Sequence, residues 1–185
     1  KCTIPYTDRK VRPIAFFVDP ALPKALYPQT ARSLTDWSNA LKNAVSYARE
    51  AECRRAANAE DLNSESARET CHAKFFEGPV ALDREDVPKG DEVVVMCHNP
   101  VEKGDSPFCG AEGRKVRKGD IREHMITWWS NPSFSRPLGV IVPSGDPLTG
   151  ENIGTAVNIF GASVETYSAR ARDQVMPTNG DLTPW

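Results

Sequence analysis

The sequence predicts an α/β (α+β) fold, with a mixed, mainly antiparallel sheet backed by helices. A short apolar strand at residues 11–18 is followed by a long helix from about Pro28, an order that favours a parallel crossover. Later apolar segments lie closer together, and the last two form a hairpin over residues 138–160. Strands that follow each other closely tend to pair antiparallel, so the second half of the chain predicts the antiparallel part of the sheet.

The long helix is predicted by apolar residues that recur at spacings of three and four. They are Ala31, Leu34, Trp37, Leu41, Val45 and Ala48. This stripe is expected to face the core. In particular, Trp37 and Leu41 are expected to pack against Phe16, Val94 and Ile159.

The middle of the chain alternates surface segments with strands. Residues 54–74 are polar and are expected to form a surface excursion. Residues 92–97 predict a strand that is apolar on both faces, and residues 98–120 predict a loop rich in glycine and charge. Residues 121–129 alternate and predict a further strand, while residues 162–176 carry apolar side chains at helical spacing.

The hairpin is the most informative local pattern. Asp146-Pro147 opens its turn, and Gly150 is suited to the positive φ that closes it. Its second strand, at residues 151–160, alternates apolar and polar positions, which predicts one apolar face. The residues of that face are Ile153, Thr155, Val157 and Ile159.

Five cysteines, none in a C-x-x-C pair, favour disulfides over a zinc ribbon or a redox motif. The local pairs Cys53–Cys71 and Cys97–Cys109 are expected, because each closes a short loop with little apolar content. Cys2 is left free or with a partner outside this chain. Dense cysteine use is typical of an exported protein, secreted or extracytoplasmic, although five reduced cysteines in a cytosolic protein remain the alternative.

Length and charge exclude several classes. The 185 residues suit a single domain, or a fragment of one, over 1–185. A net charge of −2 gives no electrostatic case for nucleic acid. No apolar run approaches the roughly 20 residues that span a bilayer. A chain that starts at Lys1 in place of Met is expected to be a trimmed or processed form.

Several segments resemble one family. Asp146-Pro147-Leu148-Thr149-Gly150-Glu151, between a strand and an alternating strand, resembles the segment ahead of the zinc helix in large bacterial metallopeptidases of the zincin group, of metzincin type. Residues 12–18 and the helix motif Trp37-Ser38-Asn39-Ala40-Leu41 resemble the family's opening strand and its W-N-x-A-F helix, with departures at Ser38 and Leu41. Residues 96–101, 109–110 and 119–122 also look like family segments.

The resemblance implies a function as well as a fold. It suggests the N-terminal part of a secreted zinc metallopeptidase domain, in which this chain forms the upper subdomain. In zincins the edge strand of that sheet binds extended substrate by β-augmentation. The resemblance places this strand in the hairpin, and its residues are taken as Ile153, Thr155, Val157 and Ile159. A hairpin edge covered by neighbouring structure is the alternative.

The zinc motif itself is absent from this chain. A zincin needs H-E-x-x-H on a helix, so that two imidazoles face one metal ion and the glutamate polarises water. The three histidines, His72, His98 and His124, do not have that spacing. We therefore expect no catalytic or metal-ligating residue and no cofactor in this chain, with zinc bound only if a downstream segment completes the site. A composite Cys/His zinc site is a less favoured alternative.

Other chemistries receive little support from the sequence. A Cys/His nucleophile pair would need thiols that disulfides remove. The carboxylates Asp83, Glu85 and Asp86 lie in a charged segment and suit solvent. Ser144 does not lie in G-x-S-x-G, and no phosphate-binding loop is present. The basic residues Lys115, Arg117 and Lys118 lack the aromatic neighbours of a nucleic-acid patch.

Three hypotheses remain. The chain is a piece of a secreted zinc metallopeptidase whose zinc helix lies outside it. In the second hypothesis, the chain is a non-catalytic extracytoplasmic interaction or assembly module with a zincin-like sheet. Such a module would bind the remainder of its precursor, another protein chain or an extended peptide. Or it is an unrelated disulfide-stapled protein.

Overall fold

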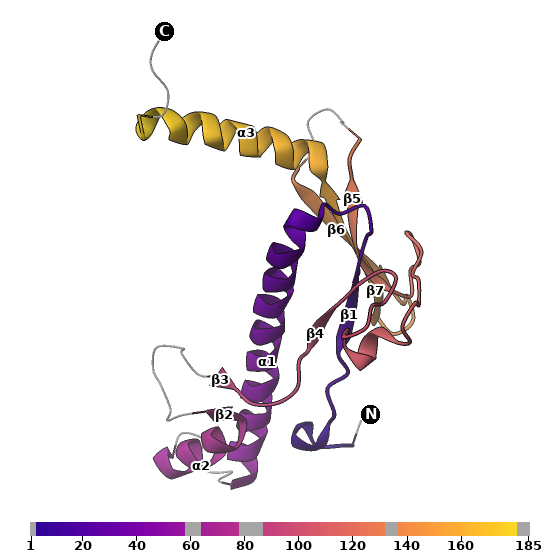
Figure 1. The fold of residues 1–185 in the computed structure, drawn as a ribbon. Helices are drawn as coiled ribbons and strands as arrows, with labels where there is room; N and C mark the ends of the chain where they lie inside the picture. The colour runs from indigo at the N-terminus through magenta and orange to yellow at the C-terminus, as the bar shows by residue number, and fades with distance from the viewer. Residues whose placement is uncertain (1–2, 58–63, 78–86, 132–136, 181–185) are drawn as a thin grey trace. The chain divides into compact units, whose positions relative to one another are not determined.

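The computed structural model describes residues 3–57, 64–77, 87–131 and 137–180 (Figure 1). The chain groups into two compact units. The first comprises Lys1–Ile14 with Pro28–Val95, and the second comprises Ala15–Tyr27 with Met96–Trp185. The expectation of one domain over residues 1–185 stays a prediction.

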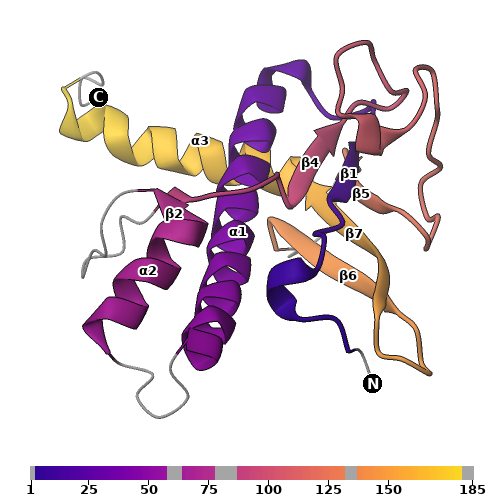
Figure 2. The ribbon, with the colours of Figure 1, turned by 90° about the horizontal axis from the view of Figure 1, so that it is seen from below.

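A five-stranded sheet has the strand order β4-β1-β5-β7-β6. Its strands are β1 (Ile14–Val18), β4 (Val94–Cys97), β5 (His124–Trp129), β6 (Gly139–Gly145) and β7 (Asn152–Phe160). Strands β1 and β7 both pair with β5 in parallel, whereas β6 and β7 form an antiparallel hairpin. Figure 2 shows this hairpin as the orange pair of strands.

The predicted α/β class with a mixed sheet is confirmed. The predicted predominance of antiparallel pairing is wrong, because the sheet is mainly parallel. The physical reason lies in the chain order. Strands β5 and β6 are consecutive but do not pair, since β7 lies between them. Among the described strands of this sheet, only β6 and β7 are joined by a short turn, which requires an antiparallel pair.

An apolar cluster lies in the second unit. Val18, Leu22 and Trp128 are buried at its centre. Leu26, Tyr27, Met96, Ile159 and Val164 pack around them. The helix α3 (Gly161–Thr178) follows β7 directly and contacts β5 and β7 (Figure 1). It begins at a glycine because a Cβ on Gly161 would lie only 2.3 Å from the Trp128 ring.

The buried carboxylate Asp19 ties the end of β1 to β5. Its oxygens accept hydrogen bonds from the backbone N–H groups of Ala21 and Trp128, and from the ammonium group of Lys118. Burial alone would raise the pKa of Asp19, but the hydrogen bonds from Lys118, Ala21 and Trp128 outweigh it and lower that pKa. A buried charge is tolerated here because it is both paired and hydrogen-bonded.

The loop after β4 is fixed at several points. The predicted disulfide Cys97–Cys109 is confirmed. The Asn99 side chain donates to the Val116 carbonyl and accepts from the Val116 N–H, both at 2.9 Å. Asp105 accepts from the backbone N–H groups of His98 and Glu102. Burial would raise the pKa of Asp105, but these hydrogen bonds and the His98 ring lower it.

The first unit contains the long helix α1 (Tyr27–Ala57), the shorter helix α2 (Glu65–Phe75), and the small antiparallel pair β2 (Phe76–Glu77) and β3 (Val87–Pro88). The predicted disulfide Cys53–Cys71 is confirmed and joins α1 to α2. Figure 2 shows these two helices side by side. Short 3-10 turns lie at Tyr6–Asp8, Lys24–Leu26 and Pro107–Cys109.

Between α1 and α2 the chain buries charge as well as apolar surface. Glu50 is fully buried, where its carboxylate pairs with Arg54 and lies 3.4 Å from His72 Nδ1. The His72 ring stacks on Phe76 with 4.6 Å between ring centroids. The predicted surface excursion at residues 54–74 therefore includes a helix with a buried inner face, although residues 58–63 lie outside the described part of the chain.

The predicted core stripe of α1 is partly wrong. Trp37 is 60% exposed and Leu41 is only half-buried, whereas Leu34, Ser38, Ser46 and Glu50 are buried. The buried face is thus rotated by about one residue toward polar positions. The physical reason is hydrogen bonding, because the Ser38 hydroxyl oxygen accepts from the N–H groups of Val93 and Val94 at 3.0 and 3.1 Å.

Ser38→Ala should destabilise the protein by about 1–3 kcal/mol, because it leaves two buried backbone N–H groups without an acceptor. Urea unfolding followed by circular dichroism measures this loss. Thr35→Ala is the matched control, since Thr35 is exposed on the same helix and its hydroxyl bonds only within that helix. Equal effects from the two substitutions would show that the Ser38 contact is unimportant.

Candidate functional site

Strand β6 is an edge of the five-stranded sheet. It pairs with β7 on one side, and no strand among the described residues pairs with its other side. The sequence placed the substrate strand at Ile153, Thr155, Val157 and Ile159. This placement needs correction, because those residues lie on β7, which pairs with β5 and β6 on its two sides. Alternation along a strand reveals its faces but not its neighbours.

The register of the hairpin shows which backbone groups of β6 face outward. The Phe160 N–H donates to the Leu138 carbonyl at 2.9 Å, so these two residues form a hydrogen-bonded pair. The same register continues through Val142 opposite Ala156. Hydrogen-bonded and non-hydrogen-bonded pairs alternate in antiparallel ladders. The backbone groups of Gly139, Ile141 and Pro143 therefore point away from β7.

The outward row is a short, well-defined set of polar groups. Gly139 and Ile141 each offer one N–H and one carbonyl, while Pro143 offers a carbonyl only. This is where a strand tolerates proline, since no ladder hydrogen bond is lost. A proline next to an apolar run is the signal that could have identified the edge strand.

The side chains along this edge are apolar and exposed. Ile141 is 66% exposed and Val142 is 51% exposed, with Leu138 similarly exposed just before the strand. No charged residue occurs from Leu138 to Gly145. Edge strands of soluble proteins are usually protected by charge or by a covering segment. We refer to the outward side of residues 139–143, together with these side chains, as the β6 edge.

Gly139 is required by the close approach of β7. A Cβ at this position would lie 2.6 Å from the Asn158 carbonyl oxygen, closer than such atoms come.

The predicted turn beyond the edge is also present. Asp146 N–H donates to Glu151, Gly150 N–H donates to Asp146, and Gly150 has φ of +73°.

The Asp146 carboxylate holds the turn together. It accepts from the Leu148 N–H at 2.9 Å and from the Thr149 hydroxyl at 2.8 Å. These hydrogen bonds lower the pKa of Asp146 below its ordinary value of 3.8. Leu148, at the tip, is 93% exposed.

The histidines have separate environments. His72 lies beside Glu50 in the first unit, while His98 Nδ1 lies 2.7 Å from Asp105 and the His124 ring packs near Phe16 in the second. Within the described ranges, no three His, Cys, Asp or Glu side chains come together as a metal site. The expectation that zinc depends on a further segment stays a prediction.

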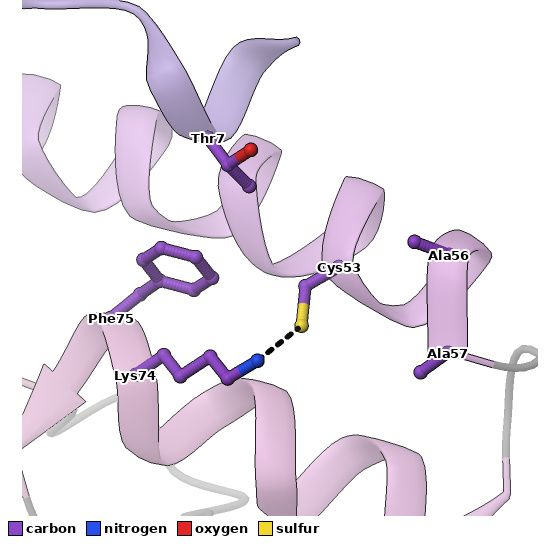
Figure 3. A pocket seen from close by; sticks show the side chains of 6 residues that line it. All are labelled: Thr7, Cys53, Ala56, Ala57, Lys74 and Phe75. Atoms are coloured by element: carbon purple, nitrogen blue, oxygen red, sulfur yellow. Dashed lines mark hydrogen bonds between the residues drawn. The ribbon is translucent and has the colours of Figure 1, made fainter.

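A pocket of about 440 Å³ lies in the first unit beside the Cys53–Cys71 disulfide (Figure 3). Lys74 Nζ lies 3.8 Å from Cys53 Sγ across it. Its lining is formed by Thr7, Cys53, Ala56, Ala57, Lys74 and Phe75. Lys74 is the one ionisable side chain among these six lining residues.

The other residues singled out from the sequence are dispersed along the chain. Cys2 and the carboxylates Asp83, Glu85 and Asp86 lie outside the described residues. Lys118 pairs with Asp19, while Lys115 and Arg117 are exposed. Ser144 lies within β6 itself. In the part of the chain that the structure describes, no helix combines the length and apolar character needed to cross a membrane.

Comparison of the chain with protein-family models, curated proteins and solved structures finds no match.

The hydrogen bonds of the turn predict an acid titration. The turn gains stability from ionised Asp146, and this gain is lost as the pH falls through the lowered pKa, below 3.8. Carboxyl ¹³C NMR should find an Asp146 midpoint under 3.8, and Thr149→Ala should raise it. Thr166→Ala, on the exposed part of α3, is the control and should leave it unchanged. A wild-type midpoint above 3.8 would contradict this account.

Proposed function

We propose that this chain supplies the substrate-side sheet of a secreted zinc metallopeptidase-like protein, with the zinc helix on a segment outside the chain. The observation that carries the proposal is the β6 edge. It combines outward backbone groups, exposed apolar side chains and the absence of charge in one strand.

An extended polypeptide suits such an edge. Its backbone would continue the sheet by hydrogen bonding to Gly139, Ile141 and Pro143, and these bonds supply affinity without regard to sequence. Alternate peptide side chains would then lie beside Ile141 or Val142, which favours apolar and β-branched residues. A folded partner could use the same edge only by presenting a strand of its own.

The resemblance of the turn Asp146–Glu151 and of the opening strand to zincin segments supports a peptidase context. The two disulfides support an extracytoplasmic location, because such bonds persist in oxidising compartments. Zinc, when bound by a completed site, polarises the peptide carbonyl and activates water. The residues of this chain hold and align the peptide.

The second candidate is a non-catalytic interaction or assembly module. It rests on the same edge, which binds a polypeptide whether or not a zinc site is nearby. The partner would be the remainder of the precursor or another extracytoplasmic protein. Nucleic acid is not proposed, because the net charge of −2 offers no attraction to phosphates.

A peptidase assay separates the two candidates. The 185-residue chain should not cleave casein or a fluorogenic peptide library, because no pair of its histidines has zincin spacing. A form extended past Trp185 in its natural reading frame should bind zinc and cleave in a chelator-sensitive way.

Chelator-sensitive cleavage by the short chain would overturn the proposed division of labour. Absence of both zinc and cleavage from the extended form would favour the assembly module. A glutamate-to-glutamine change in any H-E-x-x-H of the extension is the matched control, since it retains both zinc ligands.

A further inference from the structure

We propose that Pro143 determines the register in which the β6 edge binds an extended peptide. This inference rests on the proposed peptide-binding function and adds a specificity-determining residue to it. The basis is the count of outward hydrogen-bonding groups along the strand.

The edge offers two donors and three acceptors. Gly139 and Ile141 can each exchange hydrogen bonds with a peptide in both directions, whereas Pro143 can only accept. The backbone N–H and carbonyl groups of Val140 and Val142 point toward β7, so they are not available to a peptide on the outer side. A peptide that covers residues 139–143 therefore forms five backbone hydrogen bonds where a strand without proline would form six.

The missing donor fixes the alignment. A peptide centred between Gly139 and Ile141 accepts hydrogen bonds from both of their N–H groups. A peptide shifted by two residues toward the turn lies opposite Ile141 and Pro143, and accepts only from Ile141 because proline has no N–H. The shifted peptide leaves a carbonyl without a partner on the sheet, which costs it free energy relative to the first register. With a donor at position 143, the two registers would be nearly equivalent.

The same geometry defines the peptide that binds. Its N–H groups are needed at alternate positions, namely those that face the outward carbonyls of Gly139, Ile141 and Pro143. The N–H groups in between point to the opposite side, so proline or N-methylation is accepted there. This alternation holds for parallel and antiparallel peptides, because in both cases only every second residue of the peptide directs its N–H and carbonyl groups toward the sheet.

The apolar side chains sharpen the preference. Ile141 lies at the centre of the outward row, and its side chain is 66% exposed, against 51% for Val142. A β-branched or other apolar residue beside it covers more apolar surface than a polar one. The ligand class is thus an extended, unstructured segment with apolar or β-branched residues and without proline at alternate positions.

The test uses the acetylated, amidated peptide Lys-Thr-Val-Thr-Val-Thr-Lys and its singly N-methylated forms, titrated into ¹⁵N-labelled protein. Pro143→Ala adds a donor and should bind roughly 2–12-fold more tightly, the value of one added backbone hydrogen bond. Ile141→Pro removes a donor and should weaken binding by a similar factor. Pro147→Ala, in the exposed turn, is the matched control and should bind like the wild type.

Two further readouts identify the site. The amide resonances of Gly139 and Ile141 should shift on binding, whereas those of Val140 and Val142 should shift little. N-methylation should weaken wild-type binding at every second peptide position. Circular dichroism confirms that each variant is folded, and the gain in Pro143→Ala cannot arise from loss of folding.

The outcomes separate the inference from the function on which it rests. If the wild type binds but Pro143→Ala is unchanged and N-methylation shows no alternation, the role of Pro143 is wrong and peptide binding stands. If no folded variant binds, the β6 edge is not a peptide site and both fail. Dimerisation of the wild type in sedimentation, blocked by Ile141→Pro, would overturn the inference by assigning the edge to a second copy of the chain.

Discussion

The pairing of β7 on both of its sides is the constraint on which the candidate site depends. Its parallel register with β5 runs from Thr155 to Phe160, and its antiparallel register with β6 covers Gly154–Ile159 and Asn152. Backbones approach closely here: a Cβ on Gly154 would lie 2.2 Å from the Ile121 carbonyl oxygen. Because β7 is fully engaged, β6 is left at the edge, and the alternation of the hairpin determines which of its groups face outward.

Covalent links and buried polar groups stabilise both units in addition to apolar packing. The disulfides close separations of 18 and 12 residues, each worth on the order of 3 kcal/mol by the chain-entropy estimate. Asp19 and Glu50 are buried charges with partners, and the Ser38 hydroxyl supplies the acceptor for two strand N–H groups. Much of the specificity of both units is therefore carried by polar contacts, which fix geometry more narrowly than apolar burial does.

Local features of the fold could be predicted from the sequence, whereas long-range arrangements could not. The hairpin turn follows from Asp146-Pro147 and Gly150, and the two disulfides follow from spacing and local composition. The prediction that Trp37 lies on the buried face of α1 is wrong. Hydrophobicity along the helix cannot reveal that the Ser38 hydroxyl accepts hydrogen bonds from two backbone N–H groups of a distant segment. The position of β7 between β5 and β6 is not indicated by any local sequence pattern. Pro143 did carry one, since proline inside an apolar strand indicates an edge.

The central claim is that the outward amides of β6 are free to bind a polypeptide, and amide hydrogen exchange in the free protein tests it most directly. The account predicts rapid exchange at Gly139 and Ile141 beside slow exchange at Val140 and Val142, which bond to β7. Residue-resolved NMR measures all four in one experiment. Strong protection of Gly139 and Ile141 without any added partner would mean that the edge is already covered, and would contradict the account.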